Sequence, residues 1–404
     1  MIRTNPLFRQ AAESLWSPIP SASTGRRSLS ALKSSFPRPV TSSASFSLPY
    51  SPVPFSSPST AISSSSSRPS PRLLSPPTRH YSSVSSTPSP TVSPLIPFRT
   101  HLSPSPSTPL AHTFFHPPTS TWTYVVVHLS SRSCLIIDST LDFDPATSTV
   151  STRTADALLA FIREKGYTVE RILETHAHAD HLTAAAYLKG RLADEARPEG
   201  PPVGMSKGIR QTQAHFAAVY DVPPEELDGA FGELYEEGDE IVLGRADGEG
   251  IKGKVLSLPG HTACSAAFQF GDYVFVGDTI FLPTLGSARA DFPAGSAPSL
   301  YTSSQRLLSL PPRTRLFSGH HYPSKPEENV CSATVAEQKE YNKHFGGGKG
   351  EGEFVKMREE RDRGLNEPGL LHQSLQVNIR GGRLPRGKDG KPYFRLPIKA
   401  PDGL

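Results

Sequence analysis

The stretch Glu174-Thr-His-Ala-His-Ala-Asp-His181 decides the interpretation of this chain, because it places three imidazoles and one carboxylate within six positions. An apolar run that predicts a strand comes directly before it. Alternate residues of an extended segment face the same way, so His176 and His178 should point into one cleft. Asp180 and His181 should approach that cleft from the following turn. Imidazole and carboxylate together suit zinc or iron, and we therefore predict a metal site rather than a histidine-rich surface loop.

Further candidate ligands lie downstream, and each stands at the end of an apolar run that predicts a strand. They are His261, after the run 254–258 and a Pro-Gly turn; Asp278, after the run 273–277; and His320 with its neighbour His321, after the run 314–318. Each candidate is therefore positioned by the end of a strand.

Four motifs, in this order and spacing, resemble the signature of the metallo-beta-lactamase superfamily. They are His176-Ala-His-Ala-Asp-His181, Pro259-Gly-His-Thr262, Gly277-Asp-Thr-Ile-Phe281 and Ser318-Gly-His-His-Tyr322. The resemblance implies a fold of the α/β class, a four-layer αββα sandwich in which two mixed sheets are flanked by helices. It covers roughly residues 112–398.

Two other segments resemble one branch of that superfamily. Gly286-Ser-Ala-Arg-Ala-Asp-Phe-Pro-Ala-Gly295 is similar to the Gly-x-x-Arg-x-Asp-Phe stretch of persulfide dioxygenases. Ser374-Leu-Gln-Val-Asn-Ile-Arg-Gly-Gly-Arg-Leu-Pro385 resembles the tail of their bacterial relatives, the beta-lactamase-hydrolase-like proteins. The resemblance implies one Fe(II) per chain with glutathione persulfide and O2 as partners, and a reaction that yields sulfite in sulfide oxidation.

The resemblance also assigns roles to the motif residues. The catalytic iron ligands carry over onto His176, His261 and Asp278, which would hold the ion from one side and leave coordination positions open. Iron would carry the electron redistribution, and the protein would supply ligand geometry and substrate orientation. The other polar motif residues would surround these ligands or outline a second metal position; they are His178, Asp180, His181 and His320.

Two rival functions use the same residues. A dinuclear zinc thioesterase of the hydroxyacylglutathione hydrolase (glyoxalase II) type would place His176, His178 and His261 on one ion and Asp180, His181 and His320 on another, with Asp278 bridging. Its metal-bridging hydroxide would attack a thioester carbonyl. The second rival is a non-catalytic persulfide sensor. Retention of every metal-ligand position argues against a sensor.

Substrate contacts are predicted at two positions. Arg289 offers a fixed fork of donors to a carboxylate, and glutathione has two carboxylates. Its alternative role is an ion pair with Asp291. Tyr301 is predicted either to contact the substrate or to pack in the core. Asp138 should order the loop 174–181, which we call the metal loop, rather than perform chemistry.

The chain departs from the persulfide dioxygenase pattern at three positions. His321 stands where an Asp is usual, so that a carboxylate is replaced by an imidazole that titrates near neutrality or enters the site. Ala290 replaces Cys or Thr after the arginine, and Ala263 replaces Pro. None of these is a predicted ligand, so they bear on substrate preference.

Residues 1–100 form a compositionally separate segment with 29 Ser, 17 Pro, ten Lys or Arg and one acidic residue, Glu13. Such a segment buries too little apolar surface to fold, and we predict disorder. Its arginines and serines fit a mitochondrial transit peptide, with cleavage near Tyr81 and a matrix location. The alternatives are an extension without targeting role and a cytoplasmic protein.

Removing that segment changes the charge argument, because residues 101–404 hold 32 basic and 37 acidic residues, a net charge of −5. We therefore expect no nucleic-acid partner, and no apolar run is long enough to predict a membrane span. Three scattered cysteines predict no disulfide framework. The expected organisation is a metallo-beta-lactamase domain over 112–345 and a C-terminal helix and tail over 346–404 packed on it, with a homodimer as one candidate assembly.

The remaining patterns predict the elements around the site. They indicate a hairpin of strands 123–128 and 133–138, a helix over 153–165 ended by Gly166, a strand over 168–173, helices over 183–192 and 208–220, a turn at 221–224 and a strand over 240–243. After the last ligand they predict helices over 327–345 and 353–363, split by a Gly-rich loop at 346–350.

Overall fold

The computed structural model describes residue 95 and residues 97–244, 250–323 and 329–401 of the 404-residue chain. The predicted transit peptide and its cleavage point lie outside these residues, as does nearly all of the segment 1–100. At its end, however, Arg99–His101 form strand β1, which pairs antiparallel with β2. The folded part therefore begins before residue 100, because β1 satisfies its backbone hydrogen bonds on the edge of a sheet.

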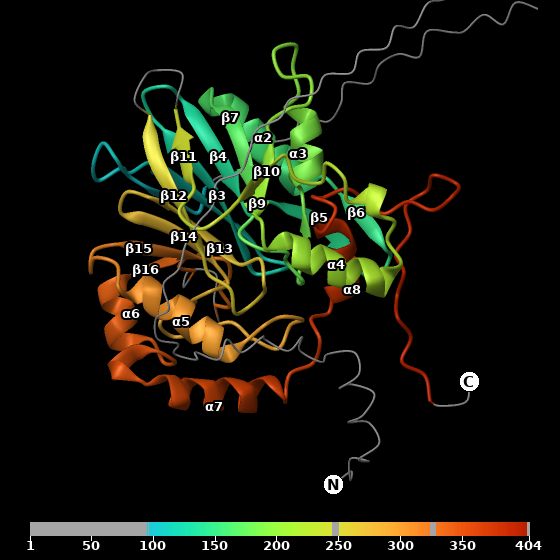
Figure 1. Cartoon of the computed structure of the whole chain (residues 1–404). Helices are drawn as coiled ribbons and strands as arrows, with labels where there is room; N and C mark the ends of the chain where they lie inside the picture. The colour runs from blue at the N-terminus through green and yellow to red at the C-terminus, as the bar shows by residue number, and fades with distance from the viewer. Residues whose placement is uncertain (1–94, 96, 245–249, 324–328, 402–404) are drawn as a thin grey trace, which may run out of the picture. The chain divides into compact units, whose positions relative to one another are not determined.

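Figure 1 shows the elements in chain order. The strands are β1, β2 (Leu110–His116), β3 (Thr121–His128), β4 (Ser133–Ile137), β5 (Thr140–Asp144), β6 (Thr149–Ser151), β7 (Thr168–Leu173), β8 (Leu182–Thr183), β9 (Val203–Ser206), β10 (Glu233–Tyr235), β11 (Glu240–Leu243), β12 (Ile251–Ser257), β13 (Ala266–Phe270), β14 (Tyr273–Gly277), β15 (Arg315–Ser318) and β16 (Ser332–Thr334). The helices are α2 (Arg153–Lys165), α3 (Ala185–Arg191), α4 (Ile209–Tyr220), α5 (Ala297–Leu308), α6 (Val335–Tyr341), α7 (Glu351–Asp362) and α8 (Leu371–Asn378), with 3-10 turns at Pro224–Glu226 and Gly346–Gly348.

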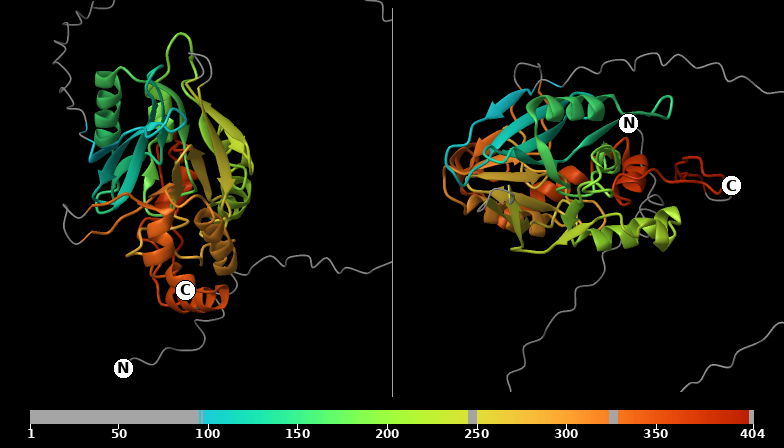
Figure 2. Two further views of the ribbon diagram at one scale, coloured as in Figure 1. Left: turned by 90° about the vertical axis from the view of Figure 1, so that its left-hand side faces the viewer. Right: turned by 90° about the horizontal axis from the view of Figure 1, so that it is seen from above.

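Two large sheets face each other, and helices cover their outer faces (Figure 2). One sheet has seven strands in the order β1-β2-β3-β4-β7-β9-β10, and the other has six in the order β11-β12-β13-β14-β15-β16. Both sheets are mixed, because β4 and β7 pair in parallel, as do β14 and β15. A third, small sheet has the order β6-β5-β8. This is the predicted four-layer αββα sandwich.

Strand β3 illustrates how the sequence produces these layers. Trp122, Tyr124 and Val126 pack between the two large sheets, whereas Val125 and Val127 pack on the opposite face with α2. Side chains alternate along a strand, so a continuous apolar run is buried on both faces. Burial of one such side chain stabilises the folded state by about 1.5–3 kcal/mol. The loops that carry the predicted metal ligands follow strands that border this inter-sheet layer.

Most predicted elements are confirmed. The predicted hairpin is β3 and β4, which pair antiparallel, and the helix over 153–165 has its predicted bounds, with Gly166 in the left-handed conformation at its end. The strands over 168–173, 240–243 and 273–277 also match. The helix predicted over 183–192 is shorter, because residues 182–183 pair with β5 as strand β8 before α3 begins.

The helix predicted over 327–345 is wrong in much of its described length. Residues 324–328 lie outside the described part, and 332–334 form β16, which pairs antiparallel with β15. Helix α6 begins only at Val335, where Thr334 and Glu337 form a capping box. Sheet pairing at the start and this cap therefore override the helical pattern.

The described residues bear on two further predictions. None of the described helices combines the length and the apolar composition needed to cross a membrane. The three cysteines, Cys134, Cys264 and Cys331, are buried and free, which agrees with the predicted lack of a disulfide framework.

Candidate metal centre

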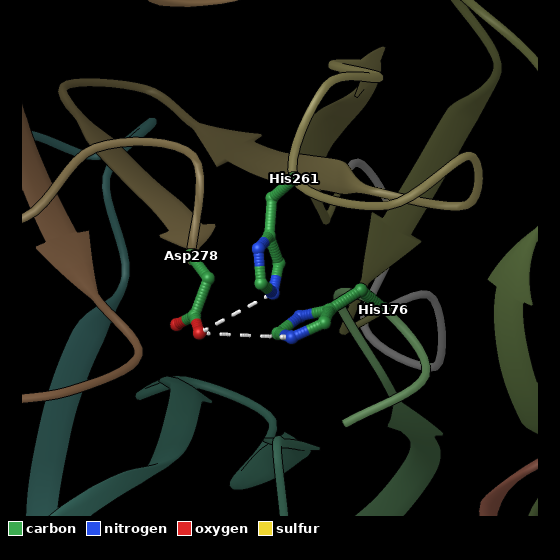
Figure 3. A group of neighbouring side chains, drawn as sticks. All are labelled: His176, His261 and Asp278. Atoms are coloured by element: carbon green, nitrogen blue, oxygen red, sulfur yellow. Dashed lines mark ion pairs between the residues drawn. The ribbon is translucent and has the colours of Figure 1, made fainter. Parts of the chain in front are cut away.

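Three loops bring the predicted ligands to one place (Figure 3). His176 follows β7, His261 follows β12 and Asp278 follows β14. All three residues are buried, and their candidate ligand atoms lie within 4.8 Å of one another. Asp278 Oδ2 is 3.8 Å from Nε2 of His176 and 3.7 Å from Nε2 of His261. We call these three residues the first ligand group; their role as ligands stays a prediction.

Atoms of the first ligand group have the bonding capacity that a cation would fill. His176 Nε2 and Asp278 Oδ1 are buried and lack a hydrogen-bond partner within the described part of the chain. Buried polar atoms in folded proteins are almost always hydrogen-bonded, so such orphan atoms require an explanation. A bound cation provides one, and two imidazoles with one carboxylate suit Fe(II) or zinc. The residues present therefore fit the implied metal.

Burial also sets the protonation states that metal binding requires. It holds the pKa of His176 well below its ordinary value and lowers the pKa of His261, even though Asp278 opposes the latter shift. Both imidazoles are therefore neutral near pH 7, which is the form that binds a metal. Burial raises the pKa of Asp278, because it disfavours the charged form. A cation placed beside the carboxylate would favour that charged form and offset the effect of burial.

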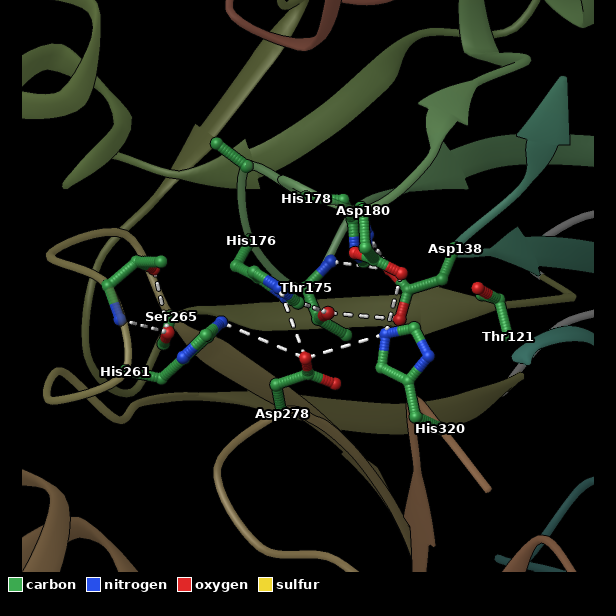
Figure 4. Close-up of polar contacts among 12 residues, drawn as sticks. Thr121, Asp138, Thr175, His176, His178, Asp180, His261, Ser265, Asp278 and His320 are labelled. Atoms are coloured by element: carbon green, nitrogen blue, oxygen red, sulfur yellow. Dashed lines mark hydrogen bonds and ion pairs between the residues drawn. The ribbon is translucent and has the colours of Figure 1, made fainter. Parts of the chain in front are cut away.

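A second ligand group lies beside the first (Figure 4). It consists of His178, Asp180 and His181, all from the loop after β7, with ligand atoms within 4.8 Å of one another. His178 Nδ1 and His181 Nε2 are buried and have no partner among the described residues. His320 adjoins this group, because its Nε2 is 3.2 Å from Asp180 Oδ2 and 3.5 Å from Asp278 Oδ2. The structure therefore gathers all seven predicted motif residues.

Two buried carboxylates stand behind His178. Its Nε2 is 3.2 Å from Asp138 Oδ1 and 3.3 Å from Glu174 Oε2. Burial would lower the pKa of His178, but these carboxylates outweigh it and hold the pKa well above the ordinary value. Asp138 also accepts hydrogen bonds from the backbone N–H and the hydroxyl of Thr175, at 2.8 and 2.9 Å. Asp138 thus orders the loop that carries His176 and His178, as the sequence predicts. Because the pKa of His178 is raised, its Nδ1 carries a proton that a metal bound there would have to displace.

Two glycines allow strand ends to approach the ligands closely. Gly277 precedes Asp278 with φ of 51°, and a Cβ there would lie 2.3 Å from the Thr175 hydroxyl oxygen. Gly319 precedes His320, and a Cβ there would lie 2.4 Å from Asp278 Oδ1. A side chain at either position would therefore force Thr175 or Asp278 to move, and glycine preserves the geometry of the site.

Arg289 contacts His261 through its backbone. The Nδ1–H of His261 donates to the Arg289 carbonyl oxygen at 2.8 Å, which leaves Nε2 for a metal. The guanidinium donates to both carboxylate oxygens of Asp291 at 2.6 Å and to the Asn366 carbonyl at 2.7 Å, and it lies over the Phe292 ring. The ion pair that the sequence left open is therefore formed, and a substrate role for the side chain stays a prediction. Phe292 belongs to the segment that resembles the family stretch, but no role is predicted for it from the sequence; its ring meets His261 edge-on at 5.0 Å.

Tyr301 lies in the layer of α5 and α7. Its hydroxyl donates to the Lys349 carbonyl at 3.1 Å, and its ring packs 6.3 Å from Phe345 and 5.6 Å from Phe354. These contacts match the packing alternative stated for this residue. Its predicted contact with substrate remains untested.

His321 turns toward the segment that follows the site. Its Nδ1 lies 3.2 Å from Asn329 Oδ1 and accepts a hydrogen bond from the Val330 N–H at 3.1 Å. Its backbone N–H donates to the Ser120 carbonyl at 3.1 Å. These contacts hold the turn that carries His320.

A buried amide from α8 holds the metal loop, and sequence reasoning missed it. Asn378 Nδ2 donates to the carbonyl oxygens of His178 and His181 at 2.7 and 2.8 Å. Its Oδ1 accepts from the Thr183 N–H at 2.9 Å. One amide therefore satisfies three backbone groups around the second ligand group. The only signal in the sequence was the resemblance of the segment 374–385, which marks the segment but not the residue.

Comparison with known proteins agrees with this geometry. Residues 116–320 match the metallo-beta-lactamase superfamily. A beta-lactamase hydrolase-like protein of Xylella fastidiosa is 42% identical over 298 residues, which cover 73% of this chain and 66% of that protein. The chain thus spans about two thirds of that relative's length.

Two other relatives carry names with different activities. Glyoxylase B2 of Dictyostelium discoideum is 38% identical over 278 residues, covering 68% of this chain and 91% of that protein. The human mitochondrial persulfide dioxygenase ETHE1 is 28% identical over 237 residues, covering 58% of this chain and 74% of that protein.

Proposed function

The chain belongs to the metallo-beta-lactamase superfamily, and within it we propose that it is a persulfide dioxygenase. In the proposed reaction, glutathione persulfide, O2 and water give sulfite and glutathione, at one Fe(II) that would be held by His176, His261 and Asp278. The first ligand group, a buried pair of imidazoles facing one carboxylate, offers the residues that such a site needs, and it would serve zinc as well as iron. The resemblance of the Arg289 segment and of the C-terminal tail supports this choice within the superfamily.

The chain's own residues have defined tasks in this reaction. Fe(II), when bound, supplies the redox chemistry that dioxygen requires. The hydrogen bond from His261 to the Arg289 carbonyl fixes the imidazole ring, and the Asp278 carboxylate balances the charge of the ion. The Phe292 ring lies edge-on against His261 and would keep water from that side of the ligand. Arg289 would bind a glutathione carboxylate in exchange for its ion pair with Asp291.

We also propose a mitochondrial matrix location, since the N-terminal composition fits a transit peptide and one relative is named as mitochondrial. Import followed by removal of the first 80 or so residues would leave an acidic protein. Expression of the full chain with a fluorescent protein at its C-terminus tests this. Fluorescence throughout the cytoplasm would reject the matrix location and favour the alternative.

The dioxygenase is tested by oxygen uptake. The full chain is purified without air, loaded with one equivalent of Fe(II) and given glutathione persulfide in an oxygen electrode. We expect oxygen consumption with stoichiometric sulfite, and none with the matched variant Asp278→Ala. An iron-loaded protein that binds persulfide but consumes no oxygen would reject the proposal and favour the persulfide sensor.

A zinc thioesterase remains the second candidate, because the second ligand group and His320 are also assembled. That function requires two metal ions per chain and cleavage of a glutathione thioester. Metal analysis of the protein purified anaerobically separates the two functions. One iron per chain supports the dioxygenase, while two zinc ions together with thioester cleavage support the hydrolase.

A further inference from the structure

We propose that Asp362, at the end of α7, is a positioning residue for the metal centre that acts on His261 through a single peptide group. The inference rests on the proposed function only in taking His261 as a metal ligand. It concerns the peptide that joins Arg289 to Ala290, which lies between the two side chains.

This peptide is hydrogen-bonded on both sides by buried side chains. Its carbonyl oxygen accepts from Nδ1 of His261 at 2.8 Å, and its N–H donates to Oδ2 of Asp362 at 2.9 Å. His261 is 5% exposed and Asp362 is 6% exposed. Carboxylate, peptide and imidazole thus form one continuous chain of hydrogen bonds that ends at the nitrogen facing Asp278.

The carboxylate of Asp362 is itself fixed by Arg358, one turn earlier on α7. The Nε and a terminal nitrogen of Arg358 both donate to Oδ1, at 2.9 and 2.5 Å, so Oδ2 is left for Ala290. The same guanidinium reaches the carbonyl oxygen of Ser287, in the loop that carries the peptide. A buried charge is costly without a partner, and this pair supplies one. The carboxylate is therefore held in place and oriented toward the loop.

The arrangement has a consequence for the ligand. Hydrogen bonds in a chain polarise one another, so a peptide whose N–H binds a carboxylate carries more negative charge on its carbonyl oxygen. That oxygen holds the Nδ1–H of His261 more firmly, which fixes the ring and makes Nε2 a better donor to a metal. Histidine ligands commonly donate their second N–H to a carboxylate or a backbone carbonyl for this reason. Here the carboxylate acts through the carbonyl.

An asparagine at position 362 would not serve equally. A carboxylate accepts hydrogen bonds at both oxygens, whereas an amide has one acceptor oxygen and one donor nitrogen. If the amide oxygen faced Ala290, the amide nitrogen would face the Arg358 guanidinium, and two donors would oppose each other. Asp362→Asn therefore loses either the charge behind the peptide or the bond to it.

The experiment measures Zn²⁺ affinity of the full chain by titration against a competing chelator. Asp362→Asn should weaken Zn²⁺ binding about tenfold, at the low end of the effect of partners that orient a metal ligand. The matched control Arg358→Lys disturbs the same ion pair but keeps the carboxylate, and it should bind Zn²⁺ almost as tightly as the unaltered chain. In a His261→Ala background, Asp362→Asn should cause no further loss. Unchanged affinity, or an equal loss in both backgrounds, would overturn the proposed link from Asp362 through the Arg289-Ala290 peptide to His261, which we call the relay.

A second measurement needs no variant of Asp362 and so survives a failure of that variant to fold. The sequence contains two Arg-Ala peptides, Arg245-Ala246 and Arg289-Ala290, so arginine labelled at the carbonyl carbon and alanine labelled at nitrogen give two amide signals. Arg245→Lys removes one and assigns the other. Zn²⁺ should move the Ala290 amide proton downfield. A signal that stays in place while Zn²⁺ binds would overturn the relay.

Neither measurement involves oxygen or persulfide. The relay can therefore fail while oxygen uptake succeeds, and the dioxygenase can fail while Zn²⁺ still reports the link between Asp362 and His261. If His261→Ala leaves Zn²⁺ affinity unchanged, both the relay and the first ligand group are rejected together.

Discussion

The first and second ligand groups lie side by side but are built in different ways. Members of the first come from three loops that follow three different strands, whereas the three members of the second lie within four positions, 178–181, of one loop. In the first group, burial keeps both imidazoles neutral. In the second, Asp138 and Glu174 take up one nitrogen of His178 and raise its pKa.

This difference predicts separate tasks for the two groups. The first group offers neutral donors whose other contacts orient them, as the Arg289 carbonyl does for His261. The second group is tied into the protein through Asp138, Glu174 and Asn378, and it also stabilises the shape of the loop. We expect its loss to disturb the loop more than the metal. Variants that affect one group at a time test this division.

The largest expected effect is the loss of the metal from the first ligand group. Asp278→Ala and His261→Ala should each weaken Fe(II) retention by more than about 100-fold, beyond the range for residues that only orient ligands. His178→Ala should leave most of the iron in place, because it removes a residue whose other nitrogen is already bound by carboxylates. Iron content after anaerobic gel filtration provides the measurement.

The thermal unfolding of each variant without metal serves as the control. Equal iron loss in all three variants, at similar apo-protein stability, would abolish the distinction between the groups. It would instead favour a shared two-metal centre, as the thioesterase requires.

A smaller effect on stability should follow from Asn378→Ala. The substitution leaves the Thr183 N–H and the carbonyls of His178 and His181 without their partner, and each unsatisfied buried group costs about 1 kcal/mol or more. We expect the free energy of unfolding of the metal-free protein to fall by about 3 kcal/mol in a urea titration. Gln373→Ala, at a half-buried position of the same helix, is the matched control. If Asn378→Ala removed iron as thoroughly as Asp278→Ala, the second group would have to support the first directly.

The division between the two groups also explains what could be predicted from the sequence. Ligands at strand ends, such as Asp278, follow from local apolar runs, and so does most of the sheet framework. The support of the loops does not, because Asn378 acts some 200 residues from the carbonyls that it binds. The sequence pattern predicts helix at 332–334 for the same reason, since the strand there is determined by pairing with β15 and not by local residues. Close approaches such as that of Gly319 to Asp278 are likewise visible only in three dimensions.

A change in KM of about tenfold is expected at Arg289, whose carbonyl oxygen binds His261 of the first ligand group. Arg289→Ala removes one charge-assisted contact to a glutathione carboxylate, so the KM for glutathione persulfide should rise about tenfold while iron content stays unchanged. Asp291→Asn is the control, since it releases the guanidinium from its ion pair without removing it. An unaltered KM in Arg289→Ala would limit this residue to its backbone bond with His261.

The smallest effect lies at the outer end of the second ligand group. His181 is linked through Thr121 and Thr119 to His116, at 3.4, 2.8 and 2.7 Å along the way, and His116 lies 3.3 Å from the Asp142 carboxylate. Burial alone would raise the pKa of that carboxyl, but hydrogen bonds from His116 and Thr154 outweigh it and lower the pKa from 3.8 to about 2.

Because the folded protein prefers the ionised form, Asp142 stabilises the fold above pH 3.8, and this stabilisation is lost as the pH falls toward 2. After allowance for solvent screening, Asp142→Asn should lower the free energy of unfolding by about 1 kcal/mol at pH 7. In urea titrations the difference from the unaltered chain should shrink as the pH falls from about 5 to about 2, while iron content at pH 7 stays the same. A difference that is constant over this range would mean that the carboxylate acts through its shape rather than its charge. Iron loss in Asp142→Asn would show that the hydrogen-bonded path to His181 reaches the first ligand group as well.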